Sequence, residues 1–250
     1  MKFVLAVVTT IAVLLIWALS AWYVDSPLLL PSPARVFNNA ARLWESGDLT
    51  MHVWASLRRL LVGLVIGAPL GAIVGCSMGW SQIVDGLLNP YVRFFNSIPA
   101  LTLVPFSLLW LGVSETSRYA LLVYTISLAV LLSARQGVKT VPPIRLKTAD
   151  MMGLSRAAVL FRVVIPSCFP AILAGVRTAL GLGVMVIVAA EMLGAESGLG
   201  YLIMQARSHF NMANLFVGVI GLGLLSLILD RTFMLTVDSI LPRWSLRRRI

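Results

Sequence analysis

The chain has 250 residues, of which 59% are hydrophobic and 12% are charged, and its formal net charge is +10. A soluble globular domain carries about 25% charged residues, so this composition, with a mean hydropathy of +0.92, excludes an ordinary water-soluble protein. It predicts an all-α, polytopic integral membrane protein. The basic residues lack the interleaved aromatic residues of a nucleic-acid-binding face, and we assign their excess to membrane topology and contact with anionic lipid.

Uncharged stretches predict about six transmembrane helices, because a membrane-spanning helix needs about 20 apolar residues. Five stretches contain no Asp, Glu, Lys or Arg, and a sixth is broken only by Arg177. In chain order, the predicted helices are residues 3–24, 60–84, 94–114, 119–134, 163–190 and 208–229. Pro99 and Pro105 are expected to kink the third helix, and the fourth needs Tyr119 or a snorkelling Arg135 to reach full length.

Residues 1–24 are either a membrane anchor or a cleavable signal peptide. Lys2 precedes an apolar run with small residues near its end, as in a signal peptide, but the run continues through Trp22 and Tyr23. The apolar part of a signal peptide is only about 7–15 residues long, and aromatic residues mark a membrane interface, so we favour an anchor. The remaining parts are an extracytoplasmic segment at 25–57, a helical core at 58–240 and a basic tail at 241–250.

Lysine and arginine are unevenly divided between the two sides of this topology. The side of the N-terminus holds most of them, including Lys2, Arg93 and the arginines of the tail. Cytoplasmic segments carry an excess of Lys and Arg, so both termini are expected in the cytoplasm. The pair Arg58 and Arg59, before the second helix, argues mildly for the opposite orientation.

The longest polar interruption of the sequence lies between the fourth and fifth predicted helices. It is basic, yet apolar residues such as Leu154, Ala157 and Phe161 recur in it at helical spacing. We expect a coupling elbow at 138–167 that is stopped by Ile165-Pro166. It is expected to bend at Gly153, either because a Cβ would stand in the way or because the residue adopts a left-handed conformation. A structured basic loop between membrane helices is suited to bind a cytoplasmic partner.

The second predicted helix contains a regular row of glycines. They are spaced by four residues: Gly63, Gly67, Gly71, Gly75 and Gly79. Such a row opens a groove in which a neighbouring backbone approaches closely. The neighbour belongs either to the same chain or to a second subunit, and in both cases the second helix is central rather than lipid-facing.

The sequence contains no motif that indicates catalysis, a cofactor or a metal. There is no phosphate-binding G-x-x-x-x-G-K-[ST], no H-E-x-x-H and no G-x-S-x-G, so we expect neither an enzyme nor a nucleotide site. Cys76 and Cys168 are expected to be reduced packing residues. His52 and His209 lie far apart in predicted outer segments and are expected to be ordinary surface histidines rather than metal ligands.

Three patches of the sequence resemble the permeases of ATP-binding-cassette importers. Residues 147–153 (K-T-A-D-M-M-G), with V-V-I-P at 163–166, resemble the EAA loop, E-A-A-x-x-x-G with a later I-x-L-P. Lys147 replaces the glutamate of that loop. Residues 96–117 are similar to R-P-I-P-P-L-A-L-x-P…W-F-G-x-G-E-x-S of the nitrate/sulfonate/taurine branch, and residues 189–201 to its A-A-E-x-x…S-G-L-G-Y.

The resemblance implies a type I importer-like permease in the bacterial inner membrane, paired with a second copy as a homodimer. Two cytoplasmic ATPase subunits would bind the elbows, and an extracytoplasmic solute-binding protein would deliver a small oxyanion such as a sulfonate, taurine or nitrate. Glu115 and Glu191 are candidates for a gate or for docking of the binding protein. The candidate ATPase-coupling residues are Lys147, Ala149, Asp150, Gly153, Leu154, Arg156, Ala157, Ile165 and Pro166.

A self-sufficient channel or ion-coupled carrier is the alternative function. Such a protein binds its coupling ion through acids or paired charges at mid-membrane, whereas the predicted mid-span positions here are almost free of charge. Arg177, the exception, is expected to snorkel to the inner interface. A third alternative, a scaffold subunit of a membrane complex, would not explain the shaped elbow.

Overall fold

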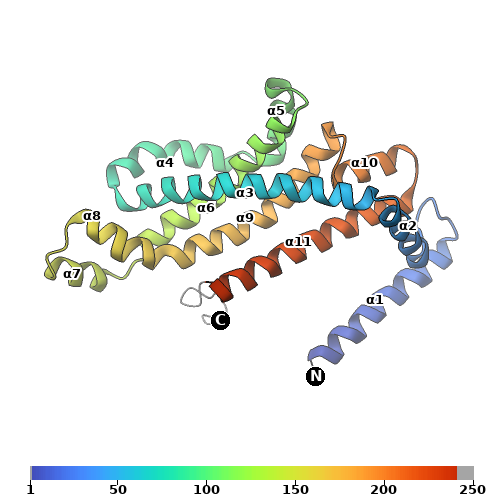
Figure 1. Cartoon of the computed structure of the whole chain (residues 1–250), viewed down its shortest axis with the longest axis horizontal. Helices are drawn as coiled ribbons and strands as arrows, with labels where there is room; N and C mark the ends of the chain where they lie inside the picture. Colours follow the sequence, from blue (N-terminus) through green and yellow to red (C-terminus); the bar gives the residue numbers. More distant parts are fainter. Residues whose placement is uncertain (1, 241–250) are drawn as a thin grey trace.

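The computed structural model describes residues 2–240, so the basic tail at 241–250 lies outside the described residues. All the secondary structure that these residues form is helical, arranged as an elongated bundle (Figure 1). The α-helices are α1 (Lys2–Val24), α2 (Pro33–Glu45), α3 (Asp48–Trp80), α4 (Gln82–Ser97), α5 (Leu103–Leu111), α6 (Glu115–Lys139), α7 (Pro143–Met151), α8 (Arg156–Val159), α9 (Ile165–Gly194), α10 (Leu199–Ser208) and α11 (Met212–Ile240).

Five helices of the described chain are long and apolar enough to cross a membrane, and the number is six if a bent pair of helices is one span. The five are α1, α3, α6, the continuous stretch from α8 through α9, and α11. The bent pair is α4 with residues 100–111, whose axes differ by 75°. The expected number of spans is therefore confirmed, with one of them broken.

The break differs from the expected kinked helix at 94–114. The first arm begins at Gln82, and the chain turns at Ile98 and Pro99 into a short 3-10 turn that leads into α5. Pro105 adds no second kink because it lies in the first turn of α5, where backbone N–H groups have no partner within the helix. One proline at the junction thus suffices to turn the chain.

Two helices were not anticipated from the sequence, and others extend beyond their expected bounds. The helix α2 starts at a Ser32 cap followed by Pro33, a combination that favours helix initiation, and α10 follows Gly198. The helix α3 begins at Asp48, inside the expected extracytoplasmic segment, and α6 covers 115–139. These extensions contain charged and polar residues, so an uncharged stretch does not include them.

The expected stop at Ile165-Pro166 is wrong, because the helix continues through both residues. Between α8 and α9 the chain makes a π-helical turn at Leu160–Val164, in which the Ile165 N–H bonds to the Leu160 carbonyl. This wider turn absorbs the local change in register, and Pro166 occupies the first turn of α9, where its missing N–H leaves no bond unmade.

The glycine row of α3 lies against α6 of the same chain. A Cβ atom placed on Gly63 would lie 2.6 Å from the Leu122 Cβ, and one on Gly67 would lie 3.0 Å from the Val123 carbonyl oxygen. At Gly71 and Gly75 a Cβ would strike backbone carbonyls of α6. The row therefore serves packing within one subunit, and its face is not open to a second copy.

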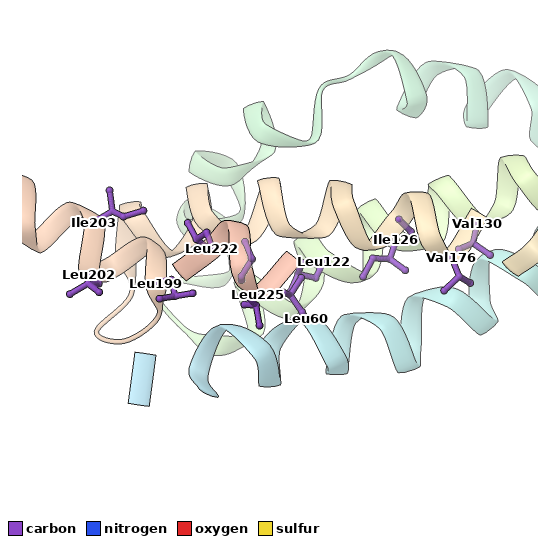
Figure 2. Close-up of a cluster of buried hydrophobic side chains, with 12 residues drawn as sticks. Leu60, Leu122, Ile126, Val130, Val176, Leu199, Leu202, Ile203, Leu222 and Leu225 are labelled. Atoms are coloured by element: carbon purple, nitrogen blue, oxygen red, sulfur yellow. The ribbon is translucent and has the colours of Figure 1, made fainter. Parts of the chain in front are cut away.

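The main apolar cluster joins α3 and α6 to α9, α10 and α11 (Figure 2). Leu60 of α3 meets Leu122 and Ile126 of α6 in it, and all three are almost fully buried. The bundle has two ends, which are named here after the short helices at each. The α7–α8 end contains α7, α8 and the α3–α4 turn, and the α2–α10 end, at the opposite side of Figure 1, contains α2 and α10.

Candidate functional site

The α7–α8 segment, residues 143–159, is a compact helical elbow. Two hydrogen bonds close the end of α7, from the Gly153 N–H to the Asp150 carbonyl (3.0 Å) and from the Leu154 N–H to the Ala149 carbonyl (3.2 Å). This pairing is the Schellman motif, which requires a left-handed residue, and Gly153 supplies it with φ of +71°. Ser155 then begins α8 by accepting a hydrogen bond from the Ala158 N–H.

Gly153 is needed for its backbone conformation rather than for space. Nothing lies within 4 Å of the position that a Cβ would occupy there. Any other residue would nevertheless have to adopt a positive φ, which costs least for Asn and most for β-branched side chains. Of the two expected reasons for this glycine, a Cβ standing in the way of the turn is therefore wrong, and the left-handed conformation is confirmed.

The expected coupling residues divide between an exposed surface and a buried attachment. Leu154, Ile165 and Pro166 are half-buried, and Ala149 is buried in a small cluster with Val138 and Cys168 that attaches α7 to the bundle. The exposed members are Lys147, Asp150, Gly153, Arg156 and Ala157. Asp150 and Arg156 also line a hollow of about 610 Å³ between the elbow and the α3–α4 turn.

An apolar patch on the elbow was missed from the sequence. Met151 is 89% exposed and Met152 is 73% exposed. Ile144 and Phe161 are similarly exposed nearby in the chain. Methionine side chains adapt their shape to a partner surface, so this patch is better suited to docking than Leu154 and Ala158, which are half-buried.

A buried charge network occupies the α2–α10 end, centred on Arg59 of α3. Its guanidinium donates to both Glu115 carboxylate oxygens, at 2.6 and 2.8 Å, and to Glu191 at 2.8 Å. It also donates to the Ser197 carbonyl at 2.7 Å. Ser56 donates to Glu191, and the two side chains of the Arg59–Glu191 pair are almost fully buried. The network thus joins α3, α6 and α9 to the α9–α10 loop.

The loop Ser197–Gly200 wraps around the Glu191 carboxylate. The Gly200 N–H donates to Glu191 at 2.9 Å, and the Leu199 N–H donates to Ser56 at 2.9 Å. A Cβ on Gly198, whose φ is +121°, would strike the carboxylate, and one on Gly200 would lie 2.5 Å from the Val188 carbonyl. Gly198, seven residues after Glu191, is thus required by the carboxylate, and Gly200 is required by the α9 backbone at Val188.

Arg118 and His52 complete the network. Arg118 donates to Glu115 at 2.8 Å and to the Gly194 carbonyl. His52 is buried and accepts a hydrogen bond from the Gly198 N–H at 3.2 Å. The expectation of a surface histidine is therefore wrong for His52, because α3 starts earlier than expected and carries it into the bundle.

Other polar pairs hold the rest of the bundle. Arg135 of α6 makes a two-pronged ion pair with Asp85 of α4, at 2.5 and 2.9 Å, and Lys139 joins it at 2.7 Å. Arg177, which was expected to snorkel, pairs with Asp230 of α11 at 2.6 Å, an ion pair between helices that the sequence did not indicate. These pairs tie α4 and α11 to the central helices.

The two cysteines lie side by side. The Cys76 and Cys168 sulfur atoms are 3.9 Å apart, in the cluster that attaches the elbow to the bundle, and both residues are free thiols. The sequence offered no signal for this neighbourhood, because the residues come from helices far apart in the chain. No group of three or more potential metal ligands occurs within residues 2–240.

A groove of about 470 Å³ opens where the broken span meets α6 and α9. Its lining is mostly apolar, with Pro99, Leu128 and Met185 as examples, and it contains no Asp, Glu, Lys or Arg among the described residues. Its polar groups are amides and hydroxyls: Asn96, Tyr124, Thr125, Ser133 and Thr178. Irregular backbone at membrane depth is tolerated where it faces protein or a water-filled path, and the turn at Ile98 and Pro99 lines this groove.

Comparison with known proteins gives consistent matches. Residues 67–245 match the protein family described as "Binding-protein-dependent transport system inner membrane component". The chain is 34% identical to a probable ABC transporter permease protein of Brucella abortus (strain 2308), over 92% of each chain. It is 33% identical to the taurine transport system permease protein TauC of Escherichia coli (strain K12), covering 88% of this chain and 83% of that one.

The chain is also similar to another transport permease and to a solved structure. The putative aliphatic sulfonates transport permease protein SsuC of Escherichia coli is 30% identical, over 94% of this chain and 89% of its own. The crystal structure of an amino acid ABC transporter with histidines is similar in fold, with a TM-score of 0.64 at 16% identity, covering 81% of this chain and 97% of that chain.

Proposed function

Because this chain belongs to the family of binding-protein-dependent transport system inner membrane components, and is an ABC importer permease of the sulfonate and taurine type, we propose how it works. Each copy forms half of a homodimeric path. Cytoplasmic ATPase subunits bind the α7–α8 segment, and an extracytoplasmic binding protein delivers the solute at the α2–α10 end. The observation that carries this proposal is the exposed elbow with its apolar patch, presented at one end of a bundle with a broken span.

The α7–α8 segment transmits the motion of the ATPase. Met151 and Met152 supply an adaptable apolar contact, and Arg156 offers a guanidinium for a carboxylate at the rim. Ala149 anchors the segment in the cluster with Cys168, and α8 continues without interruption into α9. A displacement of the elbow is therefore passed along a single 39-residue helix to the opposite end of the bundle.

The groove at the broken span forms this chain's share of the translocation path. Its neutral hydroxyl and amide groups can donate hydrogen bonds to an oxyanion without the strong binding that a cation would give. A path of this kind lets the solute pass, and the selection of the solute belongs to the binding protein. The proposed solutes are taurine and aliphatic sulfonates, which appear in the names of two relatives.

The charge network at the α2–α10 end positions the helices instead of binding a coupling ion. Glu191 already accepts from Arg59, Ser56 and Gly200, so it has no free side for an ion. Glu115 is partly exposed, and a role for it in docking the binding protein is proposed. With the cations of the elbow in the cytoplasm, this end faces outward and both termini face inward.

Transport by purified components tests the proposal. The permease is reconstituted in proteoliposomes with its ATPase and binding protein, and uptake of taurine, an alkanesulfonate, nitrate and histidine is measured. We expect sulfonate uptake that requires ATP and both partners. Uptake driven by an ion gradient in vesicles that contain this chain alone would instead establish a self-sufficient carrier.

A further inference from the structure

The helix α2 is amphipathic and lies at the α2–α10 end beside exposed aromatic residues. Trp22 and Tyr23, at the end of α1, are 80% and 86% exposed, and Phe37 and Trp44 of α2 are 74% and 64% exposed. Aromatic side chains concentrate where a membrane meets water. An amphipathic helix flanked by them lies in the plane of that interface. The polar face of α2 carries Arg35, Asn38, Asn39 and Arg42.

Two hollows of opposite character lie on the two sides of α2. An apolar cleft of about 410 Å³ lies between α1, α2 and α11, and Trp17, Ala40 and Leu224 are among its walls. A polar groove of about 600 Å³ lies on the other side of α2, with Arg35 and Arg42 in its lining. The polar face of α2 therefore lines the groove, and its apolar face lines the cleft.

The groove and the cleft follow one another in depth. Along α11 the groove touches Met212 and Ala213 in the first turn, whereas the cleft extends from Val217 to Leu224. At a rise of 1.5 Å per residue, the cleft starts about 6 Å beyond Ala213 along α11 and ends about 16.5 Å beyond it. A polar pocket at the interface above an apolar one within the hydrocarbon matches the order of a lipid headgroup and its acyl chain.

Charge and existing contacts favour an anionic occupant. No acid is among the described residues that line either hollow. Arg35 and Arg42 are exposed, and neither guanidinium makes an ion pair with any residue between 2 and 240. The upper part of the cleft is preformed, because the Trp17 indole donates to the Pro31 carbonyl (3.1 Å) and stacks on Phe216 with ring centres 5.5 Å apart.

We propose that this site binds one anionic glycerophospholipid. The phosphate lies in the groove, where the planar guanidinium groups of Arg35 and Arg42 can donate paired hydrogen bonds to its oxygens. One acyl chain lies in the cleft between α1 and α11. Neither free phosphate nor an acidic protein segment would use the cleft, whereas a lipid uses both hollows. The bound lipid joins α1, which packs loosely, to the rest of the bundle.

Lipid binding to the purified protein tests the site directly. The delipidated permease in mild detergent is titrated with dioleoyl phosphatidylglycerol, dioleoyl phosphatidylcholine or glycerol phosphate, and binding is measured by native mass spectrometry and by the shift in Tm. We expect phosphatidylglycerol to bind at least about tenfold more tightly than phosphatidylcholine, because both lipids carry the phosphate but the choline cation of phosphatidylcholine would be repelled by the same two guanidinium groups. Equal binding of the two lipids, or an equal Tm shift with glycerol phosphate, would overturn the proposal.

Variants separate the headgroup from the acyl chain. The double variant Arg35→Gln/Arg42→Gln should lose the preference for phosphatidylglycerol, and Ala40→Leu, which fills the cleft, should weaken both lipids. Arg207→Gln, at an exposed arginine of the same end that lines neither hollow, is the matched control and should bind as the wild type does. If Arg207→Gln has the same effect as the double variant, the preference is unspecific and the site is refuted. If Ala40→Leu reduces dimer yield and leaves lipid binding intact, a second copy covers the cleft and the proposal is also wrong.

Discussion

The two ends of the bundle use polar residues in opposite ways. At the α2–α10 end, Arg59 and Glu191 are buried, and their hydrogen bonds are made by neighbouring helices and by the loop Ser197–Gly200. At the α7–α8 end, Lys147 and Arg156 are exposed beside Met151 and Met152. A buried and satisfied network restricts the arrangement of helices, whereas an exposed mixed surface remains available to a partner. We therefore expect the buried network to position the helices and the exposed surface of the α7–α8 segment to bind the ATPase.

The largest effect on stability is expected from Glu191→Ala. It removes the carboxylate that accepts hydrogen bonds from Arg59, Ser56 and Gly200, and each buried donor left unpaired costs about 1–3 kcal/mol. Thermal unfolding in detergent should show a large loss of Tm. The control is Glu196→Gln, at an exposed acid in the following loop, which should unfold as the wild type does. A similar Tm for Glu191→Ala and Glu196→Gln would mean that the network does not position the helices.

A somewhat smaller loss is expected from Gly71→Leu. The side chain would press against the α6 backbone at Ser127, and overpacking costs about 1–3 kcal/mol or more. Gly223→Leu in α11 is the matched control, since nothing lies within 4 Å of a Cβ there. Measurement of Tm and of monodisperse yield should separate the two variants. Equal behaviour would place the glycine face of α3 in lipid.

The smallest effect on stability, with a clear effect on assembly, is expected from Met151→Ser/Met152→Ser. Both side chains are exposed, so the Tm should change by no more than the surface-substitution range of about 0.5 kcal/mol. Co-purification of the ATPase should fall. Met51→Ser, at a half-exposed methionine of the opposite end, should retain the ATPase. Undiminished ATPase recovery with the double variant would show that docking does not use this patch.

Local hydropathy sufficed to predict about six spans, because each span, the broken one included, contains an apolar stretch whose signal does not depend on its neighbours. The early start of α3 was missed because its first turns are polar. A signal was present: His52, Ser56 and Arg59 continue the face of the glycine row at spacings of three and four residues. Polar residues on the packed face of a membrane helix indicate buried partners.

Contacts between distant segments could not be predicted. Arg59 pairs with Glu115 and Glu191, which follow it by 56 and 132 positions in the chain. Helical spacing relates only residues a few positions apart, so it does not predict these pairs. The continuation of the chain through Pro166 depends on the π-helical turn before it, which propensity alone does not reveal. In contrast, the bend at Gly153 was predictable, since a glycine between two short helical stretches is typical of a left-handed cap.

The central claim is that the α7–α8 segment couples ATP hydrolysis to transport, and substitution at Gly153 tests it most directly. Solute uptake and binding-protein-stimulated ATP hydrolysis are measured in proteoliposomes for the wild type, Gly153→Val and Gly153→Asn. Valine at φ of +71° carries strain of about 1–3 kcal/mol, while Asn tolerates this conformation. We predict that both activities fall about tenfold with Val and stay near the wild-type level with Asn. All three proteins should insert into the membrane to the same extent. Wild-type uptake and hydrolysis in Gly153→Val would contradict the account.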